Sequence, residues 1–244
     1  MKYAVDLRIG SFQVDVHKRL RAAAFMDLAQ EMAYLAAEAM HFGYDELQVE
    51  GKAWVLSRMH FRFDQVPMWG EHVRLSTWHK GPYGPFYLRD FRMEDLQGGT
   101  LVAATSSWVV LDVASRRMVR SSEVVEMIPD STVCSDQSIP EPAPKVVVPS
   151  AAEMLPAGEH VVAYSDVDLL GHTNNVRYLV WALDSIGWDI LSEGVADDVV
   201  INFNHETRPG ERVCLTKGFH EGTWYVEGRV EDRPAFLVSI HVKR

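Results

Sequence analysis

Two stretches of the chain carry apolar residues at the three- and four-residue spacing of an amphipathic helix. The first runs from Leu20 to Met40 and is rich in alanine and leucine, which favour helix formation. The second lies within residues 174–191. The apolar positions are Leu20, Ala24, Leu28, Met32, Leu35, Ala36 and Ala39 in the first stretch, and Val176, Leu179, Val180, Leu183, Ile186 and Ile190 in the second. The pattern predicts one long helix in each half of the chain.

Runs rich in β-branched and aromatic residues, typical of strands, follow each predicted helix. They lie within residues 54–63, 72–79, 86–95 and 100–113 after the first helix, and within 198–206, 211–220, 223–232 and 235–243 after the second. One long helix followed by an antiparallel meander, twice over, indicates an α+β fold.

Proline residues concentrate between the two halves. Six of the eleven prolines lie between Pro129 and Pro156. Because proline fixes φ and lacks an amide donor, this stretch is not expected to form a regular helix or a central strand. It indicates a connector, so we expect an N-terminal domain over residues 1–145 and a C-terminal domain over residues 155–244.

The two halves also match in sequence. Residues 61–76 align with residues 201–216 without a gap, and the identical pairs are Phe63/Phe203, Gly70/Gly210, Glu71/Glu211, Val73/Val213 and Leu75/Leu215. These identities are weak alone, but the shared order of helix and strands supports them. We interpret the chain as an internal duplication.

Polar residues cluster at the start of the second predicted helix and not at the start of the first. They are Asp166, Asp168, His172, Asn174 and Asn175. Helix capping by Asp or Asn explains one or two of them, but not a histidine together with two asparagines. Arg19 stands about where His172 stands.

A carboxylate also distinguishes the halves. In the matched strands, Glu206 stands where the first half has Val66. A solvated carboxylate on an edge strand is the simplest interpretation, because glutamate is depleted in strands and rarely buried unpaired. The histidine cluster favours a functional role instead. Alternation along a strand places the neighbouring His205 on the opposite face, so it is not expected to be a partner.

Composition and charge exclude several classes of function. The formal net charge of −10 argues against general nucleic-acid binding, which needs a cationic surface. The basic stretch Arg116, Arg117 and Arg120 is most simply a solvated turn or strand end. Two cysteines exclude a disulfide framework and a four-cysteine zinc site, and no histidine spacing is typical of zinc. There is no secretory signal and no uncharged apolar run long enough to span a bilayer, so we expect a cytoplasmic protein with no metal and no cofactor.

The polar cluster resembles the signature of the acyl-acyl-carrier-protein thioesterases, known from plant plastids and from bacteria. That signature reads Asp-x-Asp-x-Asn-x-His-x-Asn-Asn, followed by a tyrosine three residues on and a tryptophan three after that. The matching residues here are Asp166, Asp168, His172, Asn174, Asn175, Tyr178 and Trp181. The resemblance covers the whole chain, through the duplicated halves and the Trp54–Arg58 run.

The resemblance implies a tandem hot-dog fold, in which each half is a long helix wrapped by an antiparallel sheet. It implies that only the C-terminal half is catalytic, and that Asp168, His172 and Glu206 belong to a polar network that activates a water for attack on a thioester. The implied reaction is hydrolysis of fatty acyl-acyl carrier protein (acyl-ACP) to free fatty acid and holo-ACP.

The physical chemistry of thioester hydrolysis fits this assignment. Negative charge develops on the carbonyl oxygen, and amides at a helix start, near Gly171–Asn174, can stabilise it. We therefore expect Gly171, Asn174 and Asn175 to bind substrate. Reference pKa values of about 4.3 for Glu and about 6.5 for His favour His172 as the base unless burial raises the pKa of Glu206, and the choice stays open.

Two departures from the family pattern matter. The family's asparagine between the aspartate and the histidine is Leu170 here, so one network member is missing or comes from elsewhere. The cysteine that the plant enzymes place just after the glutamate is Thr207 here. Cys214 lies in a strand-like run and is expected to be a buried core thiol, so a cysteine nucleophile is not expected.

The first half is expected to shape the acyl tunnel and to be non-catalytic. Its aromatic and methionine residues suit that role and equally suit an ordinary core: Phe25, Met26, Met32, Trp54 and Trp69. Arginines could meet an acidic carrier protein, either Arg177 and Arg208 near the site or Arg58, Arg116, Arg117 and Arg120. A homodimer and the preferred acyl chain stay open.

Two alternative functions stay open. Single hot-dog thioesterases that hydrolyse acyl-coenzyme A share a similar helix start, and Leu170 also fits an acyl-binding protein without turnover. A hydratase of the same fold would need Asp-x-Asn-Pro-x-His, which Leu170 and Gly171 exclude.

Overall fold

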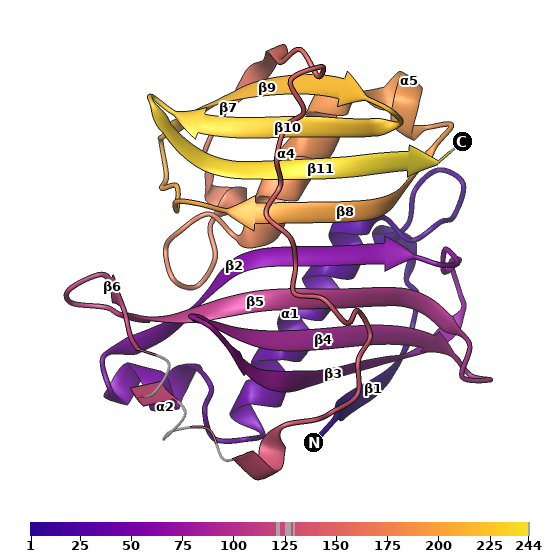
Figure 1. The fold of residues 1–244 in the computed structure, drawn as a ribbon. Helices are drawn as coiled ribbons and strands as arrows, with labels where there is room; N and C mark the ends of the chain where they lie inside the picture. Colours follow the sequence, from indigo (N-terminus) through magenta and orange to yellow (C-terminus); the bar gives the residue numbers. More distant parts are fainter. Residues whose placement is uncertain (121–122, 125–127, 129, 244) are drawn as a thin grey trace. The chain divides into compact units, whose positions relative to one another are not determined.

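A computed structural model describes residues 1–120, 123–124, 128 and 130–243. The chain divides into two compact units (Figure 1). Unit 1 consists of Met1–Leu20 and Ala24–Ala143, and unit 2 of Arg21–Ala23 and Pro144–Arg244.

Unit 1 is an antiparallel sheet with a long helix against one face. Its strands are β1 (Tyr3–Arg8), β2 (Lys52–Phe63), β3 (His72–Tyr83), β4 (Phe86–Asp95), β5 (Thr100–Asp112) and the short β6 (Arg117–Met118), and its helical segments are η1 (Ser11–Gln13), α1 (Ala22–Glu38), α2 (Tyr44–Val49) and η2 (Asp130–Thr132). The strand order is β1-β3-β4-β5-β2, and β6 pairs with β5.

Helix α1 buries a stripe of small and aromatic side chains. Phe25, Met26 and Ala29 are fully buried, and the ring of Phe25 lies 5.2 Å from that of Phe61 on β2. After the helix, His41 adopts the left-handed conformation, with φ 59°, and the amide of Phe42 donates back to the Ala37 carbonyl, as in many helix C-termini.

Unit 2 repeats this plan. Its strands are β7 (Leu155–Val161), β8 (Val195–Phe203), β9 (Arg212–His220), β10 (Thr223–Val230) and β11 (Arg233–Lys243), in the order β8-β11-β10-β9-β7, all antiparallel. Its helical segments are η3 (Tyr164–Asp166), α4 (Asn175–Ile186) and α5 (Trp188–Leu191). Figure 1 shows α4 against one face of the sheet, where Tyr178 and Leu179 are buried and α4 contacts β10 and β11.

The predicted fold class, a helix wrapped by an antiparallel sheet in each half, is confirmed. The pattern predicts the second helix as one element, and the structure has two, because Gly187 has φ 104°, which ends α4 before Trp188. Strands β1 and β7 and helix α2 are not predicted by the pattern. Pro156 does lie in a strand, but β7 is an edge strand, where a missing amide donor is tolerated.

Most of the proline-rich connector is irregular and is held by hydrogen bonds. In unit 1 it lies on the sheet face opposite α1. The indole of Trp78 donates to the Asp136 carbonyl at 2.7 Å, Lys80 donates to the Ile139 carbonyl at 2.8 Å, and the Ser138 amide donates to Asp90 at 2.7 Å. In unit 2, Asn202 bonds the connector at Pro144 and Val146.

Candidate active site

The candidate site lies on two loops of unit 2, residues 162–174 before α4 and residues 204–211 after β8. Main-chain hydrogen bonds join the loops at both ends. Val162 and the 210–211 turn exchange two bonds of 2.9 Å, and the Thr173 amide donates to the Thr207 carbonyl at 3.0 Å. The main chain alone therefore holds these residues, which are far apart in sequence, side by side.

Three buried hydroxyl groups strengthen this joint. The Oγ1 atoms of Thr173 and Thr207 lie 2.7 Å apart, and the hydroxyl of Tyr178 lies 3.1 Å from Thr207 Oγ1. The same tyrosine oxygen accepts the Thr207 amide at 2.9 Å. Because buried polar groups are costly unless paired, this network fixes how residues 172 and 206 face each other.

Asp166 anchors the loop before α4. Its buried carboxylate accepts hydrogen bonds from the Ala163 amide at 2.8 Å and Arg177 Nε at 3.0 Å, and lies 2.7 Å from His160 Nε2. Burial alone would raise the pKa of Asp166, but the bonds from Ala163, His160 and Arg177 outweigh it and hold the pKa below its usual value. The ring of His160 stacks on Trp181 with centroids 4.4 Å apart, so this aspartate ties the loop to α4.

Asp168 shapes the turn that presents His172. Its Oδ1 accepts the Leu170 amide at 2.9 Å, its amide donates to the His172 carbonyl at 2.9 Å, and its carbonyl accepts the Gly171 amide at 3.0 Å. Gly171 has φ 76°, a conformation that glycine adopts without strain. Asp168 thus acts on His172 through the main chain.

His172 and Glu206 meet at the centre of the two loops. His172 Nε2 lies 3.5 Å from Glu206 Oε2, and Arg208 Nη2 lies 3.2 Å from Glu206 Oε1. The side chains of His172 and Glu206 are 29% and 35% exposed, so a substrate can reach both. The arrangement offers an imidazole that can take a proton, a carboxylate to stabilise the imidazolium, and an arginine that holds the carboxylate.

The amides near the helix start are only partly available to a ligand. Those of Gly171, Thr173 and Asn174 donate to main-chain carbonyls. The Asn174 side chain caps α4 by accepting the Val176 amide at 2.9 Å. Within the described part of the chain, the amide and side chain of Asn175 make no hydrogen bond, so Asn175 suits the expected substrate-binding role better than Gly171 or Asn174 does.

The corresponding loops of unit 1 have the same main chain with other side chains. Asp15 accepts the His17 amide at 2.8 Å and donates its own amide to the Arg19 carbonyl at 2.9 Å, as Asp168 does with Leu170 and His172. Arg19 bonds Asp15 through Nε at 2.7 Å. The expected match of Arg19 with His172 is confirmed.

Four expectations need correction. Glu206 lies beyond the end of β8, so it is a loop residue and not a strand residue. His205 is indeed no partner, but because its Nδ1 faces the Pro234 carbonyl at 2.7 Å. Cys214 is exposed rather than buried, since its side chain lies on the outer face of β9. Trp69, expected to face an apolar interior, is 48% exposed and Lys18 lies over its ring.

Several contacts of the site are not predicted from the sequence. Arg208 pairs with Glu206, and Arg177 pairs with Asp166. The hydroxyl joint and the contacts of His160 are also not predicted, and the contact of these arginines with a carrier protein stays a prediction. Leu170, the departure from the family signature, is 46% exposed.

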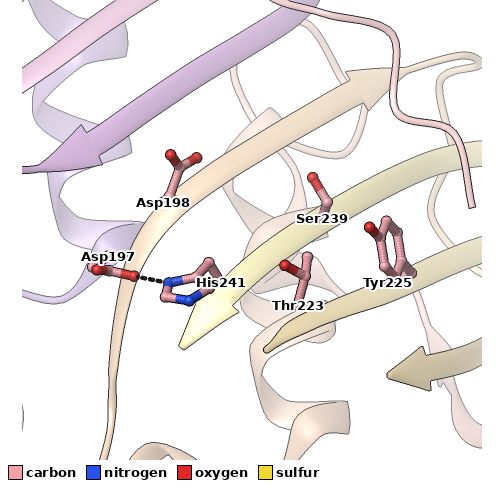
Figure 2. A pocket seen from close by; sticks show the side chains of 6 residues that line it. All are labelled: Asp197, Asp198, Thr223, Tyr225, Ser239 and His241. Carbon is pink, nitrogen blue, oxygen red and sulfur yellow. Dashed lines mark hydrogen bonds and ion pairs between the residues drawn. The ribbon is translucent and has the colours of Figure 1, made fainter. Parts of the chain in front are cut away.

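A separate polar hollow lies in unit 2, on the sheet face away from α4 (Figure 2). It is lined by Asp197, Asp198, Thr223, Tyr225, Ser239 and His241. Nδ1 of His241 lies 2.6 Å from Oδ1 of Asp197. Asp197 lies about 20 Å along β8 from the strand end that precedes Glu206, so the hollow is not part of the candidate site.

The described residues hold neither a cluster of metal ligands nor a membrane-spanning helix. No group of three or more His, Cys, Asp or Glu side chains among them could hold a metal ion. No helix in the same part of the chain is long and apolar enough to cross a membrane.

Comparisons with solved structures support the fold. An acyl-ACP thioesterase from Bacteroides thetaiotaomicron is 21% identical with a TM-score of 0.82, and the match covers 99% of this chain and 98% of that one. The 12:0-ACP thioesterase from Umbellularia californica is 18% identical with a TM-score of 0.85, over 99% and 97% of the two chains. The expected tandem hot-dog fold is confirmed by these likenesses.

Comparisons with sequences identify the family. A chloroplastic oleoyl-acyl carrier protein thioesterase 2 from Arabidopsis thaliana is 25% identical over 91% of this chain and 67% of its own length. The match spans 67%, 62% and 52% of the length of three curated relatives, the Arabidopsis oleoyl-ACP thioesterases 2 and 1 and a palmitoyl-ACP thioesterase from Gossypium hirsutum. Residues 1–128 match the family model of the acyl-ACP thioesterase N-terminal domain, and residues 153–233 match that of the acyl-ACP thioesterase C-terminal domain. The chain therefore belongs to the acyl-ACP thioesterase family.

Proposed function

We propose that this protein hydrolyses fatty acyl-ACP to a free fatty acid and holo-ACP, with its active site in residues 155–244. The observation that carries the proposal is the pair His172 and Glu206, 3.5 Å apart in unit 2, where unit 1 has Arg19 and Val66. Membership of the family and the oleoyl- and palmitoyl-ACP substrates named for its relatives support the substrate class.

In the proposed reaction, His172 takes a proton from a water as that water attacks the thioester carbonyl. Glu206 is already paired with Arg208, so its carboxylate is better placed to stabilise the imidazolium than to accept the proton. The protonated His172 then supplies the proton that the departing thiolate needs. The oxygen of the water becomes part of the fatty acid's carboxyl group. One of the water's protons passes through His172 to the thiol, and the other stays with the acid.

The remaining groups position the reactants. We assign stabilisation of the carbonyl oxygen to the Asn175 amide at the start of α4, where the helix dipole favours negative charge. Asp168 is a positioning residue, because it acts on His172 through the turn. The N-terminal domain, residues 1–145, is proposed to select the acyl chain without contributing to catalysis, since it has Arg19 and Val66 where the C-terminal domain has His172 and Glu206.

The test is release of thiol from a panel of acyl-ACP and acyl-coenzyme A substrates, of about C8 to C18, because selectivity per methylene is only about 10–200-fold. His172→Ala is compared with His205→Ala, which removes a neighbouring exposed imidazole. The proposal predicts release from acyl-ACP that His172→Ala abolishes and His205→Ala leaves intact.

Other outcomes separate the alternatives. Release from acyl-coenzyme A alone would make the protein an acyl-coenzyme A thioesterase. Bound acyl chains without release from either substrate would make it an acyl-binding protein. Whether two chains form a homodimer stays open, and native mass spectrometry would test it. The expected cytoplasmic location stays a prediction, which cell fractionation would test.

A further inference from the structure

A row of buried polar side chains crosses the apolar floor beneath α1 in unit 1. His79 on β3, Arg89 on β4 and Ser106 on β5 are direct neighbours in the sheet register. Four residues back along β3, on the same face of the sheet, another row of neighbours is wholly apolar. It consists of Leu75, Met93 and Val102. The polar row therefore interrupts a hydrophobic surface.

This row faces α1. The ring of Phe42 lies 5.6 Å from His79, and Phe42 packs in one cluster with Ala36 and Ala37 of the helix. Asp90, the neighbour of Arg89 in sequence, points to the opposite face, where Lys80 and the connector pair with it. The nearest carboxylate along the chain is thus turned away from Arg89.

Arg89 is buried without a counter-ion. Arg89 is only 6% exposed, and its hydrogen bond to the described residues is a long one, 3.3 Å from Nη1 to Thr77 Oγ1. Within the described ranges, no carboxylate forms an ion pair with it. Burial lowers the pKa of Arg89 to about 10, so it stays charged at neutral pH. A guanidinium has five N–H donors, and most of these are unused.

His79 adds a second unsatisfied group beside it. Its residue is 4% exposed, its Nε2 lies 2.6 Å from Thr132 Oγ1, and its Nδ1 is buried without a partner. Burial, together with the charge of Arg89, lowers the pKa of His79 to about 4, so the ring is neutral near pH 7. A buried charge with unused donors destabilises a fold unless something pairs with it.

We propose that Arg89 and His79 form a binding site for the carboxylate of a fatty acid in the interior of unit 1. A carboxylate can accept two parallel hydrogen bonds from a guanidinium, and the apolar rows around Arg89 suit an alkyl chain. Helix α1 contributes the small side chains Ala36 and Ala37 here.

This inference goes beyond the proposed hydrolysis and does not depend on it. A fatty acid would be the product of that reaction, yet the proposed site consists of Arg89 and His79 and needs no turnover. Its test therefore uses binding to the full chain, in the wild type and in His172→Ala, rather than activity.

The experiment is isothermal titration with dodecanoate, dodecanol and acetate at equal ionic strength. Arg89→Met removes the charge and keeps an apolar side chain of similar length. Arg92→Met is the matched control, because Arg92 lies on the same strand but faces the connector, bonding the Gln137 carbonyl. Wild type, His172→Ala and Arg92→Met are expected to bind dodecanoate, and Arg89→Met to bind it at least about tenfold more weakly.

A second readout is thermal unfolding without ligand. Arg89→Met is expected to unfold at a temperature equal to or above that of the wild type, because an unpaired buried charge is gone. Unchanged dodecanoate binding by Arg89→Met, equal binding of dodecanol, or binding of acetate as tight as dodecanoate would overturn the proposal. Failure of Arg89→Met to fold would also overturn it, since Arg89 would then be structural. Absent acyl-ACP hydrolysis would overturn only the proposed function.

Discussion

The loops that precede α1 and α4 have the same main-chain hydrogen bonds and different side chains. In both, an aspartate caps a turn whose third residue after it has positive φ, 65° at Lys18 and 76° at Gly171. In both, an amide near the start of the helix donates to the loop after the matched strand, from Leu20 to the Pro67 carbonyl and from Thr173 to the Thr207 carbonyl. The loop before α4 carries His172 opposite Glu206, where the first half has Arg19 and Val66. The scaffold is therefore common to the two halves, and the proposed chemistry depends on two side chains.

His172→Ala removes the proposed base while leaving the shared scaffold intact. We expect turnover to fall by on the order of 10²–10⁴-fold, the usual contribution of general base catalysis. Thiol release under saturating acyl-ACP measures it, with unfolding temperature as the check on structure. Turnover within a factor of about two of the wild type would rule out His172 as the base.

Glu206→Gln keeps the shape of the side chain and removes the charge that stabilises the imidazolium. The expected loss is about 10- to 100-fold in turnover, equivalent to about 1.4–2.7 kcal/mol. Because Glu206 acts through His172, the double variant should be little slower than His172→Ala alone. Effects that multiply in the double variant would show that the two residues act independently.

Asp166→Asn tests how much the Asp166 carboxylate in the loop before α4 contributes to the stability of the fold. Asp166 is a buried, charged acceptor, whereas the same place in the first loop is Gln13, which accepts the Gly10 amide at 2.7 Å. We expect a loss of about 2–4 kcal/mol in the free energy of unfolding at pH 7, measured by denaturant titration. Gln13→Ala should cost less, about 1 kcal/mol.

The Asp166 contribution should also depend on pH. Its pKa is lowered in the folded protein, so the unfolded state binds the proton more readily. The stabilisation is full above the ordinary carboxyl pKa of about 3.9 and is lost as pH falls through the folded value. The gap between wild type and Asp166→Asn should therefore narrow in acid, and a gap that widens would contradict the assignment.

Gly171→Lys gives the second loop the residue of the first. Lys18 already adopts positive φ, and nothing lies within 4 Å of a Cβ built on Gly171, so the change should cost only about 1–2 kcal/mol of stability. Turnover should be nearly unchanged. A fold that collapses would show that the two loops are less alike than their hydrogen bonds indicate.

Periodicity predicted the two helices and most strands because each buries one face, and burial leaves a repeating pattern. It did not predict β1 and β7, which are edge strands in which no residue is buried. Gly187 lies inside an apolar helical pattern, and only its φ of 104° reveals the break.

The candidate site was predicted in composition but not in arrangement. The unusual grouping of His172, Asn174 and Asn175 and the exchange of Val66 for Glu206 were visible in sequence. The pairing of Arg208 with Glu206 and the hydroxyl joint at Thr207 were not, because side-chain pairing within and between loops leaves no periodic pattern in the sequence.

The central claim is that two side chains separate the active pair of loops in unit 2 from the matched pair in unit 1. The measurement that tests it most directly is acyl-ACP hydrolysis by the double variant His172→Arg, Glu206→Val, which gives the loops of unit 2 the residues that unit 1 has at the matched positions, Arg19 and Val66. The introduced guanidinium could pair with Asp168 as Arg19 does with Asp15 at 2.7 Å, so the variant is expected to fold. We predict a wild-type unfolding temperature, within a few degrees, and hydrolysis at least about 100-fold slower. A folded variant that still hydrolyses acyl-ACP at the wild-type rate would place the chemistry elsewhere in the molecule.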